Sequence, residues 1–555
     1  MDDSAAATRV EWREWGPAAF ETANRAGKPV LLSLAATWCT HCHEMDETTY
    51  SEPRIAANVN DGFVPVRVDV DRHPRVGERY NMGGFPSTVF LTPEGEVLTG
   101  AGYLGPDGMR QVIDSVRKMW DSKGASAGSV PRAVQGNETP AGELTDDVEG
   151  RMVGRLRAAY DEAAGGWGTD AKFPMPRTVE FALKREREQA LRSLSAVSAN
   201  LLDDYAGGFF RYATEADWSG IQYEKVLDTN AALLRAFANA YLYTGDDTYR
   251  QPAERTLEYL TTTLWTGEAF AGSQAAGESA GYYTLDPSDR GDADAPPVDD
   301  TVFADWNAVA VDALLTFHAY TDDERARQYA ERALDHLRAD LVEDGRVVHY
   351  RDGDETGERG LLADHARVVR ALSTARQVLG ADVIDEAETL AAYALDDLRS
   401  AGSFTDGPAT GPALLDRPLR PLDANVEFAD ALLDLHALTG KERYWTAARE
   451  AVEAFAGASD RFGPQVAHYA AVASRVRRGG LAVAVAADAG SDLHRAALRM
   501  ADHEKVVVPE ATGDAYERGN AYVVDGPVDG AAPDAVSEPA ATPDELAALV
   551  ADRVQ

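Results

Sequence analysis

Residues 29–45 read PVLLSLAATWCTHCHEM and decide the fold of the N-terminal part of the chain. The first eight are largely apolar and predict a buried strand, whereas residues 43–50 are acidic and compatible with a helix. Between them stand Cys39 and Cys42, the only cysteines among 555 residues. The C-x-x-C spacing places both thiols within disulfide reach at a strand-to-helix junction. There the helix dipole and unbonded backbone N–H groups favour a thiolate at Cys39.

The composition is strongly acidic. The chain carries 92 acidic and 54 basic residues, a formal net charge of −38, and only eight lysines. This balance resembles that of proteins from salt-accumulating halophiles, in which a Debye length of about 3 Å at 1 M salt screens self-repulsion. We interpret the charge as an adaptation of solvation, and it argues against nucleic acid and anionic membranes as partners.

Signals for export or membrane insertion are not recognised in the sequence. Residues 1–10 lack a basic region followed by an apolar one, and no stretch approaches 18 consecutive apolar residues. We therefore expect a cytoplasmic protein. Two cysteines in such a chain indicate redox or metal chemistry and not a disulfide framework.

The residue pattern divides the chain into several domains. Residues 1–120 predict an α/β domain, and residues 121–145 form a Gly-, Ser- and Pro-rich linker. Residues 146–475 contain about twelve amphipathic helices, which fit six hairpins closing into an all-α (α/α)6 toroid. Residues 476–555 return to a small α/β pattern.

A second motif of the N-terminal domain is GGFPSTVF, residues 83–90. Pro86 opens a β-prone segment downstream of the cysteine pair. A cis peptide before Pro86 would expose a backbone edge beside the sulfurs, and proline has no N–H to compete there. The motif therefore predicts a site of the thioredoxin type.

Residues 9–115, with GKPV at 27–30, WCTHCH at 38–43 and GFP at 84–86, resemble the thioredoxin-fold domain of the spermatogenesis-associated protein 20-like family, here a haloarchaeal-type member. The resemblance implies that Cys39 attacks, Cys42 resolves, and protonated His41 stabilises the Cys39 thiolate, with Pro86 completing the site and no cofactor. A lowered thiol pKa predicts a less reducing couple than that of thioredoxin. Ser33 stands where thioredoxins usually carry a buried acid, which argues against efficient general reductase activity.

Three other interpretations of the cysteines remain open. Residues 39–43 match the C-x-x-C-H pattern of c-type haem attachment. Cys39, His41, Cys42 and His43 are possible zinc ligands, although neighbours on one helical turn converge poorly on a tetrahedron. The two thiols are also compatible with an inert, buried pair.

Motifs beyond the linker resemble the same family, whose helical part is similar to the six-hairpin toroids of glycosidases and sugar epimerases. They are GGWG at 165–168, KFPMP at 172–176, GGFFRY at 207–212, DW at 217–218, YEK at 223–225 and DWN at 305–307. They predict a substrate-binding site and no metal site. The candidate residues are Trp167, Lys172, Phe173, Arg211, Tyr212, Asp217, Trp218, Tyr223, Glu224, Lys225, Asp305, Trp306 and Asn307.

The chemistry of the toroid stays open. A glycosidase needs two carboxylates across a cavity, and the candidates are Asp170, Asp217, Glu224, Asp228, Asp305 and Asp364. An epimerase needs bases on both faces of the sugar, but Gln222 stands where the family commonly has histidine, and His365 remains. The rival interpretation of Lys225 is a plain ion pair, and that of the Gly-aromatic loops is packing.

The sequence thus predicts a thiol–disulfide redox protein whose toroid binds an unknown substrate or partner. The partner is expected to be a protein thiol or disulfide, or a small molecule such as a carbohydrate. A carbohydrate-active enzyme with a regulatory thioredoxin-like domain is the first alternative. A non-enzymatic redox sensor or scaffold is the second.

Overall fold

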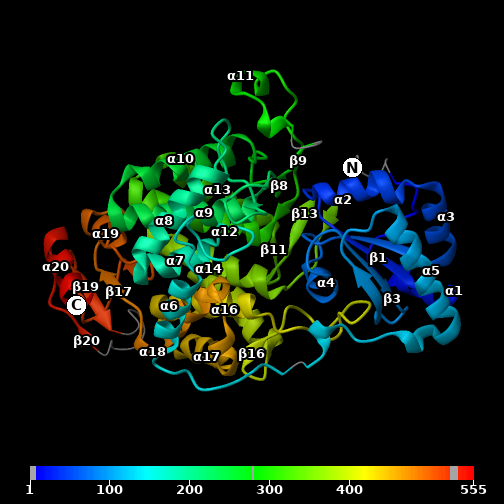
Figure 1. The fold of residues 1–555 in the computed structure, drawn as a ribbon. Coiled ribbons are helices and arrows are strands. Elements are labelled where there is room, and N and C mark those ends of the chain that lie inside the picture. Colours follow the sequence, from blue (N-terminus) through cyan, green and yellow to red (C-terminus); the bar gives the residue numbers. More distant parts are fainter. Residues whose placement is uncertain (1–7, 137, 278–280, 526–534, 555) are drawn as a thin grey trace. The chain divides into compact units, whose positions relative to one another are not determined.

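The computed structural model describes residues 8–136, 138–277, 281–525 and 535–554 (Figure 1). The chain forms two compact units. The first consists of residues 1–138, 274–299 and 405–420, and the second consists of residues 139–273, 300–404 and 421–555.

The first unit is built on a four-stranded sheet with the order β2-β1-β3-β4. β1 runs parallel to β2 and antiparallel to β3, which pairs antiparallel with β4. Every residue of β3 is buried, which explains its apolar run. The strands are β1 (Val30–Ala35), β2 (Val64–Asp69), β3 (Ser87–Leu91) and β4 (Val97–Ala101).

Helices complete this unit as a thioredoxin-like fold, which confirms the prediction for the N-terminal domain. Buried side chains of α3 and α5 share one core with Leu31 of β1 and Phe90 of β3. The α-helices are α1 (Pro17–Ala26), α2 (Thr40–Met45), α3 (Pro53–Gly62), α4 (Pro74–Tyr80) and α5 (Pro106–Lys123), with a π-turn at Asp46–Tyr50.

Two later segments of the chain belong to the first unit. Residues 405–420 are held by α4, because the buried Asp406 accepts hydrogen bonds from Arg75 Nε (3.2 Å) and Arg79 Nη1 (2.7 Å). Residues 274–299, which include α11 (Pro287–Arg290), end at Asp299, whose Oδ2 accepts from Thr37 Oγ1 (2.8 Å). A local sequence pattern cannot predict ion pairs between residues some 330 positions apart.

The second unit contains twelve toroid helices within its described residues, as the sequence predicts. Six inner helices contact one another in a closed ring, in the order α7-α9-α12-α14-α16-α18, and α6 packs against α18 to complete the outer layer. The helices are α6 (Val148–Ala159), α7 (Pro176–Arg185), α8 (Arg187–Leu201), α9 (Leu227–Thr244), α10 (Asp247–Thr262), α12 (Ala304–Thr321), α13 (Glu324–Asp340), α14 (Leu362–Leu379), α15 (Ile384–Tyr393), α16 (Leu422–Thr439), α17 (Glu442–Glu453) and α18 (Ala467–Arg478).

Inner and outer helices differ in burial. The outer helix α13 buries one stripe, Ala326, Ala330, Ala333, Leu334 and Leu337, at the spacing of one helical face. The inner helix α12 buries residues on every side. Two concentric layers require this difference, because inner helices are covered on every side and outer helices on one side only.

A repeated asparagine fixes the loop before three inner helices. Asn230, Asn307 and Asn425 are each the fourth residue of α9, α12 and α16. Each amide accepts from and donates to the backbone of one phenylalanine, at 2.6 and 3.1 Å for Asn230, 2.8 and 2.9 Å for Asn307, and 2.7 and 2.9 Å for Asn425. His365 holds the fourth position of α14 and accepts from the Val347 N–H at 3.2 Å.

Short strands in the loops between helices give the second unit its remaining order. They are β5 (Tyr212–Ala213), β6 (Ile221–Gln222), β7 (Lys225–Val226), β8 (Ser273–Gln274), β9 (Val298–Asp299), β10 (Val302–Phe303), β11 (Val342–Glu343), β12 (Arg346–Val347), β13 (Tyr350–Asp352), β14 (Glu355–Thr356), β15 (Arg399–Ser400) and β16 (Ser403–Phe404), of which β9 and the end of β8 lie in the first unit.

The C-terminal residues form the small α/β part that the sequence predicts. Its sheet has the order β18-β17-β19-β20 and packs against α14, where Gln377 Oε1 accepts the Val507 N–H at 3.0 Å. The elements are β17 (Ala482–Val485), α19 (Asp492–Leu498), β18 (Val506–Pro509), β19 (Ala521–Asp525), β20 (Ala535–Val536) and α20 (Pro543–Val554). Among the described residues no helix is long and apolar enough to span a bilayer.

Candidate redox site and the toroid axis

Cys39 and Cys42 form a disulfide, with a Cα–Cα distance of 5.3 Å. Cys39 is the N-cap of α2 in an extended conformation, and the Cys42 N–H donates to Cys39 Sγ at 3.2 Å. Both residues are buried, at 4% and 5% exposure. The pair therefore lies at the end of β1, where backbone donors at the start of α2 can support a thiolate after reduction.

The surroundings of the pair come from three loops. The Trp38 indole donates to Asp71 Oδ2 at 2.6 Å and packs edge-on against Phe85 at 6.3 Å. The Phe85–Pro86 peptide bond is cis, as predicted. Trp38 thus links the segment that carries the cysteines to the segment that carries Pro86.

His41 lies on the exposed side of α2. Its Nδ1 is 3.3 Å from Glu44 Oε2, and its ring is edge-on to Tyr103 at 6.4 Å. The Tyr103 hydroxyl donates to Glu44 Oε1 at 3.2 Å. Glu44 therefore holds His41 on the helix turn that also carries both cysteines.

A second acidic residue, Asp69, lies near the cysteine pair in the topology of the sheet. Asp69 ends β2 and pairs in register with Ala35, which ends β1 four residues before Cys39. Burial, and then the Asp299 carboxylate, raises the pKa of Asp69 to about 6, against the opposing N–H groups of Asp71 and Arg72. Ser33, at the usual position of the buried acid, is itself buried within β1.

The predicted toroid residues separate into groups. Lys172 Nζ bonds to Asp161 Oδ2 and the Gly168 carbonyl, both at 2.8 Å. Lys225 Nζ bonds to Asp203 Oδ2 at 2.6 Å and the Gly207 carbonyl at 2.7 Å. Each amine thus binds one aspartate and one glycine carbonyl of its own loop.

The predicted tryptophans of the helical unit also support loops. Trp167 is buried edge-on against Tyr160 at 5.8 Å, and Trp218 is buried and donates from Nε1 to the Ala164 carbonyl at 3.0 Å. Trp306 packs against Phe303 at 4.6 Å. Asn307 is the loop clamp of α12 described above.

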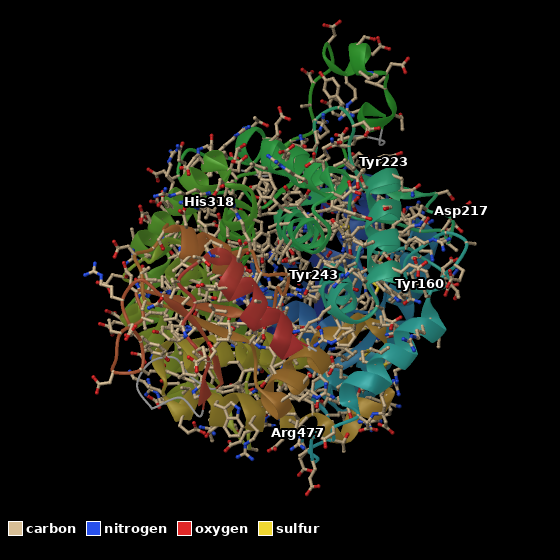
Figure 2. All side chains as sticks on the ribbon, turned by 90° about the vertical axis from the view of Figure 1, so that its left-hand side faces the viewer. Tyr160, Asp217, Tyr223, Tyr243, His318 and Arg477 are labelled. Atoms are coloured by element: carbon tan, nitrogen blue, oxygen red, sulfur yellow. A yellow bond between two sulfur atoms is a disulfide. The ribbon has the colours of Figure 1, made fainter. Side chains whose placement is uncertain are left out.

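The other predicted residues remain nearer the surface. Phe173 is 48% exposed and stacks on Tyr212 at 4.5 Å, with the Arg211 guanidinium 5.5 Å from the same ring. Arg211 Nη1 lies 3.9 Å from the buried Glu224. Of the remaining three, Tyr223 is edge-on to Phe210 at 4.9 Å, and Asp217 lies at the outer edge of its loop in Figure 2. Asp305 is buried in α12.

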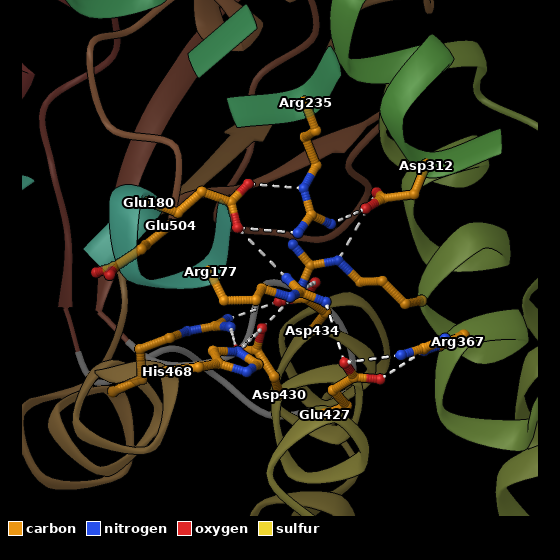
Figure 3. Close-up of polar contacts among 12 residues, drawn as sticks. Arg177, Glu180, Arg235, Asp312, Arg367, Glu427, Asp430, Asp434, His468 and Glu504 are labelled. Atoms are coloured by element: carbon orange, nitrogen blue, oxygen red, sulfur yellow. Dashed lines mark hydrogen bonds and ion pairs between the residues drawn. The ribbon is translucent and has the colours of Figure 1, made fainter. Parts of the chain in front are cut away.

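The axis of the ring is filled by ion pairs (Figure 3). Arg235 of α9 donates to Glu180 of α7 (2.7 and 2.9 Å) and also to Asp312 of α12. Arg370 of α14 donates to Asp430 of α16 at 2.9 Å. Arg475 of α18 donates to Asp434 of α16 at 2.6 Å, and Arg370 lies 3.9 Å from Asp312. The six inner helices are thereby joined by charge as well as by packing.

Such ion pairs strongly lower the pKa values of the acidic residues Glu180 and Glu427. Burial alone would raise the pKa of Glu180, but the guanidinium groups of Arg235 and Arg177 outweigh it and hold that pKa at about 2. Arg367 and Arg177 do the same for Glu427, whose pKa is also about 2. The space left among the axial side chains is about 10 Å³, room for about one water molecule. The axis at this level is a charged core and does not hold a sugar ring.

Sequence reasoning missed His349. It lies in the loop between β12 and β13, and its Nδ1 is 2.9 Å from Asp364 Oδ1, close to Asp305. A lone histidine in a short loop carries no spacing signal, so only the fold reveals this cluster.

Comparison with known proteins agrees with the N-terminal fold. The thioredoxin-like family described as "Protein of unknown function, DUF255" (Thioredox_DsbH) matches residues 3–135. Human spermatogenesis-associated protein 20 is 28% identical over 327 residues, which cover 52% of this chain and 39% of the relative. The chain thus spans about two fifths of the length of that relative. A protein disulfide-isomerase of Hordeum vulgare is 25% identical over 111 residues, covering 20% of this chain and 21% of that protein.

Among solved structures, a sugar epimerase from a ruminal bacterium matches with a TM-score of 0.46 and 12% identity, covering 56% of this chain and 83% of that one. Residues 3–135 match the DUF255 thioredoxin-like family, and the resemblance to spermatogenesis-associated protein 20 that the motifs indicate is confirmed.

Proposed function

We propose that this protein exchanges thiols and disulfides through Cys39 and Cys42, and that its toroid binds the substrate or partner. The observation that carries the proposal is the closed cysteine pair at the N-terminus of α2, with the Cys42 N–H on Cys39 Sγ. The similarity to a protein disulfide-isomerase agrees with it.

The reaction needs only the two sulfurs and a substrate disulfide. The Cys39 thiolate attacks the substrate disulfide, forms a mixed disulfide and releases one substrate thiolate. The Cys42 thiolate then attacks Cys39 Sγ, which closes the protein disulfide and releases the second substrate thiolate. The substrate gains two electrons and the cysteine pair loses two, and the reverse sequence oxidises a dithiol.

His41 and Ser33 tune this pair. Protonated His41 on the helix turn of the cysteines favours the thiolate, which stabilises the dithiol and makes the couple less reducing than thioredoxin at about −270 mV. With Ser33 in β1, the resolving thiol has no acid at that position to assist its deprotonation. We therefore propose selective exchange with one partner and not broad reductase activity.

The toroid is proposed to bind that partner on its loop side, where Phe173, Tyr212 and Arg211 present a stacked aromatic and cationic surface. A protein thiol or a small molecule, including a carbohydrate, fits such a surface. The charged axis does not favour sugar chemistry at the level of Arg235. Nucleic acid and membranes are not expected partners of a chain with a net charge of −38.

The acidic balance further supports a cytoplasmic, high-salt setting. We propose that the chain is halophilic and that its stability rises between about 0.1 M and 1 M KCl, as the Debye length falls from about 10 to about 3 Å. Thermal unfolding at both salt concentrations measures this. A Tm that falls across the series would contradict the proposal.

The test of the redox function uses the full chain in a series of glutathione buffers, with thiols counted by alkylation and gel shift. We expect one two-electron transition above about −270 mV. The Cys42→Ser variant should trap mixed disulfides with its partner, and the Cys39→Ser variant should not. Thr40→Ala, between the cysteines, is the matched control.

Each other outcome has a defined meaning. A pair that cannot be reduced, or Cys42→Ser protein that traps nothing, would reject the proposal. A pair that titrates and traps a partner without turnover would favour the alternative of a redox sensor.

A further inference from the structure

A cluster of three ionisable side chains lies in the helical unit and joins the predicted candidates Asp305 and Asp364 to His349. Asp305, His349 and Asp364 are 6%, 4% and 0% exposed. One potential ligand atom from each lies within 4.8 Å of the others. Two carboxylates and an imidazole at these separations, without solvent, require an explanation.

The cluster is held by rigid elements. Asp305 is the second residue of α12 and Asp364 the third residue of α14, and these inner helices are neighbours in the ring. His349 is fixed by its backbone, because its carbonyl accepts the Ala304 N–H at 2.8 Å and its N–H donates to Glu358 at 2.9 Å. Two helices and one backbone-bonded loop therefore place the three side chains close together.

Each carboxylate is only half satisfied. Asp305 Oδ2 accepts from Arg367 Nη1 at 2.9 Å, and Asp364 Oδ1 is 2.9 Å from His349 Nδ1. Among the described residues, the other oxygens, Asp305 Oδ1 and Asp364 Oδ2, are buried and have no hydrogen-bond partner. A buried carboxylate oxygen without a partner is costly, so both atoms favour a ligand that the described residues do not provide.

Local charge indicates the sign of that ligand. Arg367 is the cation in contact with the cluster, but it also donates to Glu427 at 2.8 Å and lies 3.9 Å from Asp228. Arg177 also lies 3.8 Å from Glu427, so two guanidinium groups face four carboxylates, those of Asp305, Asp364, Glu427 and Asp228. The site carries surplus negative charge in a buried place, which a bound cation would neutralise.

We propose that Asp305, His349 and Asp364 bind one divalent transition-metal ion, of the Zn²⁺ or Mn²⁺ type. An imidazole nitrogen with carboxylate oxygens suits these ions, whereas Ca²⁺ and Mg²⁺ prefer oxygen ligands alone. The 2.9 Å between His349 Nδ1 and Asp364 Oδ1 is compatible with both atoms binding one ion. Because all three residues are buried, the ion is structural: it ties α12 to α14 and to the loop of His349, and it is taken up during folding.

The test uses the full chain, purified without a metal-affinity step and kept with Cys39 and Cys42 oxidised, so that the thiols cannot bind metal. The protein is unfolded in a chelator, refolded with ZnCl₂, MnCl₂ or no metal, passed through a desalting column and analysed by mass spectrometry for metals. We expect one Zn²⁺ or Mn²⁺ per chain and a Tm several degrees above that of the metal-free sample. Refolding with CoCl₂ should add a visible absorption spectrum that reports a nitrogen ligand.

Variants separate this cluster from adventitious binding. His349→Gln and Asp364→Asn should lose the metal and the Tm increment. Asp423→Asn removes an acid from the second position of α16, the equivalent of Asp305 in α12, and should keep both. Metal below one tenth of an equivalent in the wild-type protein, or full retention by His349→Gln, would overturn the proposal. The wild-type comparison decides even where a variant does not fold, and it does not depend on the redox function.

Discussion

The cysteine site and the toroid axis are built in opposite ways. The cysteine site takes its two sulfur atoms from four consecutive residues after β1, whereas the axis joins charges on six helices that lie as far apart in sequence as Glu180 and Arg475. The first is a local motif that a strand and a helix N-terminus position. The second exists only after the ring has closed. The difference predicts that redox chemistry and stability can be changed separately in this molecule, and variants can test that prediction.

The largest expected effect is the loss of disulfide exchange in Cys39→Ser. Cys39→Ser removes the attacking sulfur, so exchange with a model disulfide should fall to the uncatalysed rate. Because the disulfide closes a loop of only four residues, its loss should cost about 2 kcal/mol or less of unfolding free energy. Exchange kinetics and denaturant unfolding of the same samples measure both quantities. Residual exchange at a wild-type rate would contradict the local assignment.

The converse variant acts on stability. Glu180→Gln keeps the shape of the side chain but leaves the Arg235 guanidinium with one buried carboxylate fewer, and we expect a loss of about 3–5 kcal/mol. The redox potential of the cysteines should not change.

The pH dependence of this effect has a defined sign. Because the folded-state pKa of Glu180 is about 2, below its unfolded value, its contribution is present above about pH 4.5 and is lost as the pH falls toward 2. The wild-type and variant unfolding curves should therefore converge in acid. A constant difference from pH 7 to pH 2 would show that charge is not the cause.

Two loops of the toroid provide a matched pair. Lys225→Met removes the ammonium partner of the Asp203 carboxylate, which is 2% exposed, and should cost about 3 kcal/mol. Lys172→Met leaves Asp161, 21% exposed, which water can solvate, and should cost about 1 kcal/mol. Urea unfolding of both variants measures the difference. Equal losses would show that burial of the acid does not set the cost.

A gain of stability is expected from a substitution of Asp69. Its folded-state pKa of about 6 exceeds the unfolded value, so the folded protein is destabilised as the pH rises from about 4 to about 6, and the loss is complete above that range. Asp69→Asn should remove this fall and gain about 1–3 kcal/mol at pH 7 relative to wild type. Asp299→Asn, which removes the neighbouring charge, should give a smaller gain. Parallel pH curves for Asp69→Asn and wild type would reject the assignment.

Much of this architecture follows from local pattern. The strand at residues 30–35, the cysteine spacing and the proline of GGFP predict the thioredoxin-like fold because period, apolarity and backbone restriction are local properties. The twelve amphipathic stretches predict the ring for the same reason. The sequence predicts the contacts of Lys172 and Lys225 less directly. Both loops nevertheless contain an acid, two glycines and a lysine, and this repeat was a signal in the sequence.

The amino-acid sequence by itself determined the reactive pair, the helical count and the strongly negative balance, because each depends on the order and identity of neighbouring residues. Only the tertiary structure decided that 405–420 belongs with α4, that Arg235 meets Glu180 and Asp312, and that His349 lies beside Asp305 and Asp364. The physical reason is that ion pairs join residues far apart in sequence and follow no sequence period. Their partners are set only when the helices close the ring and exclude water.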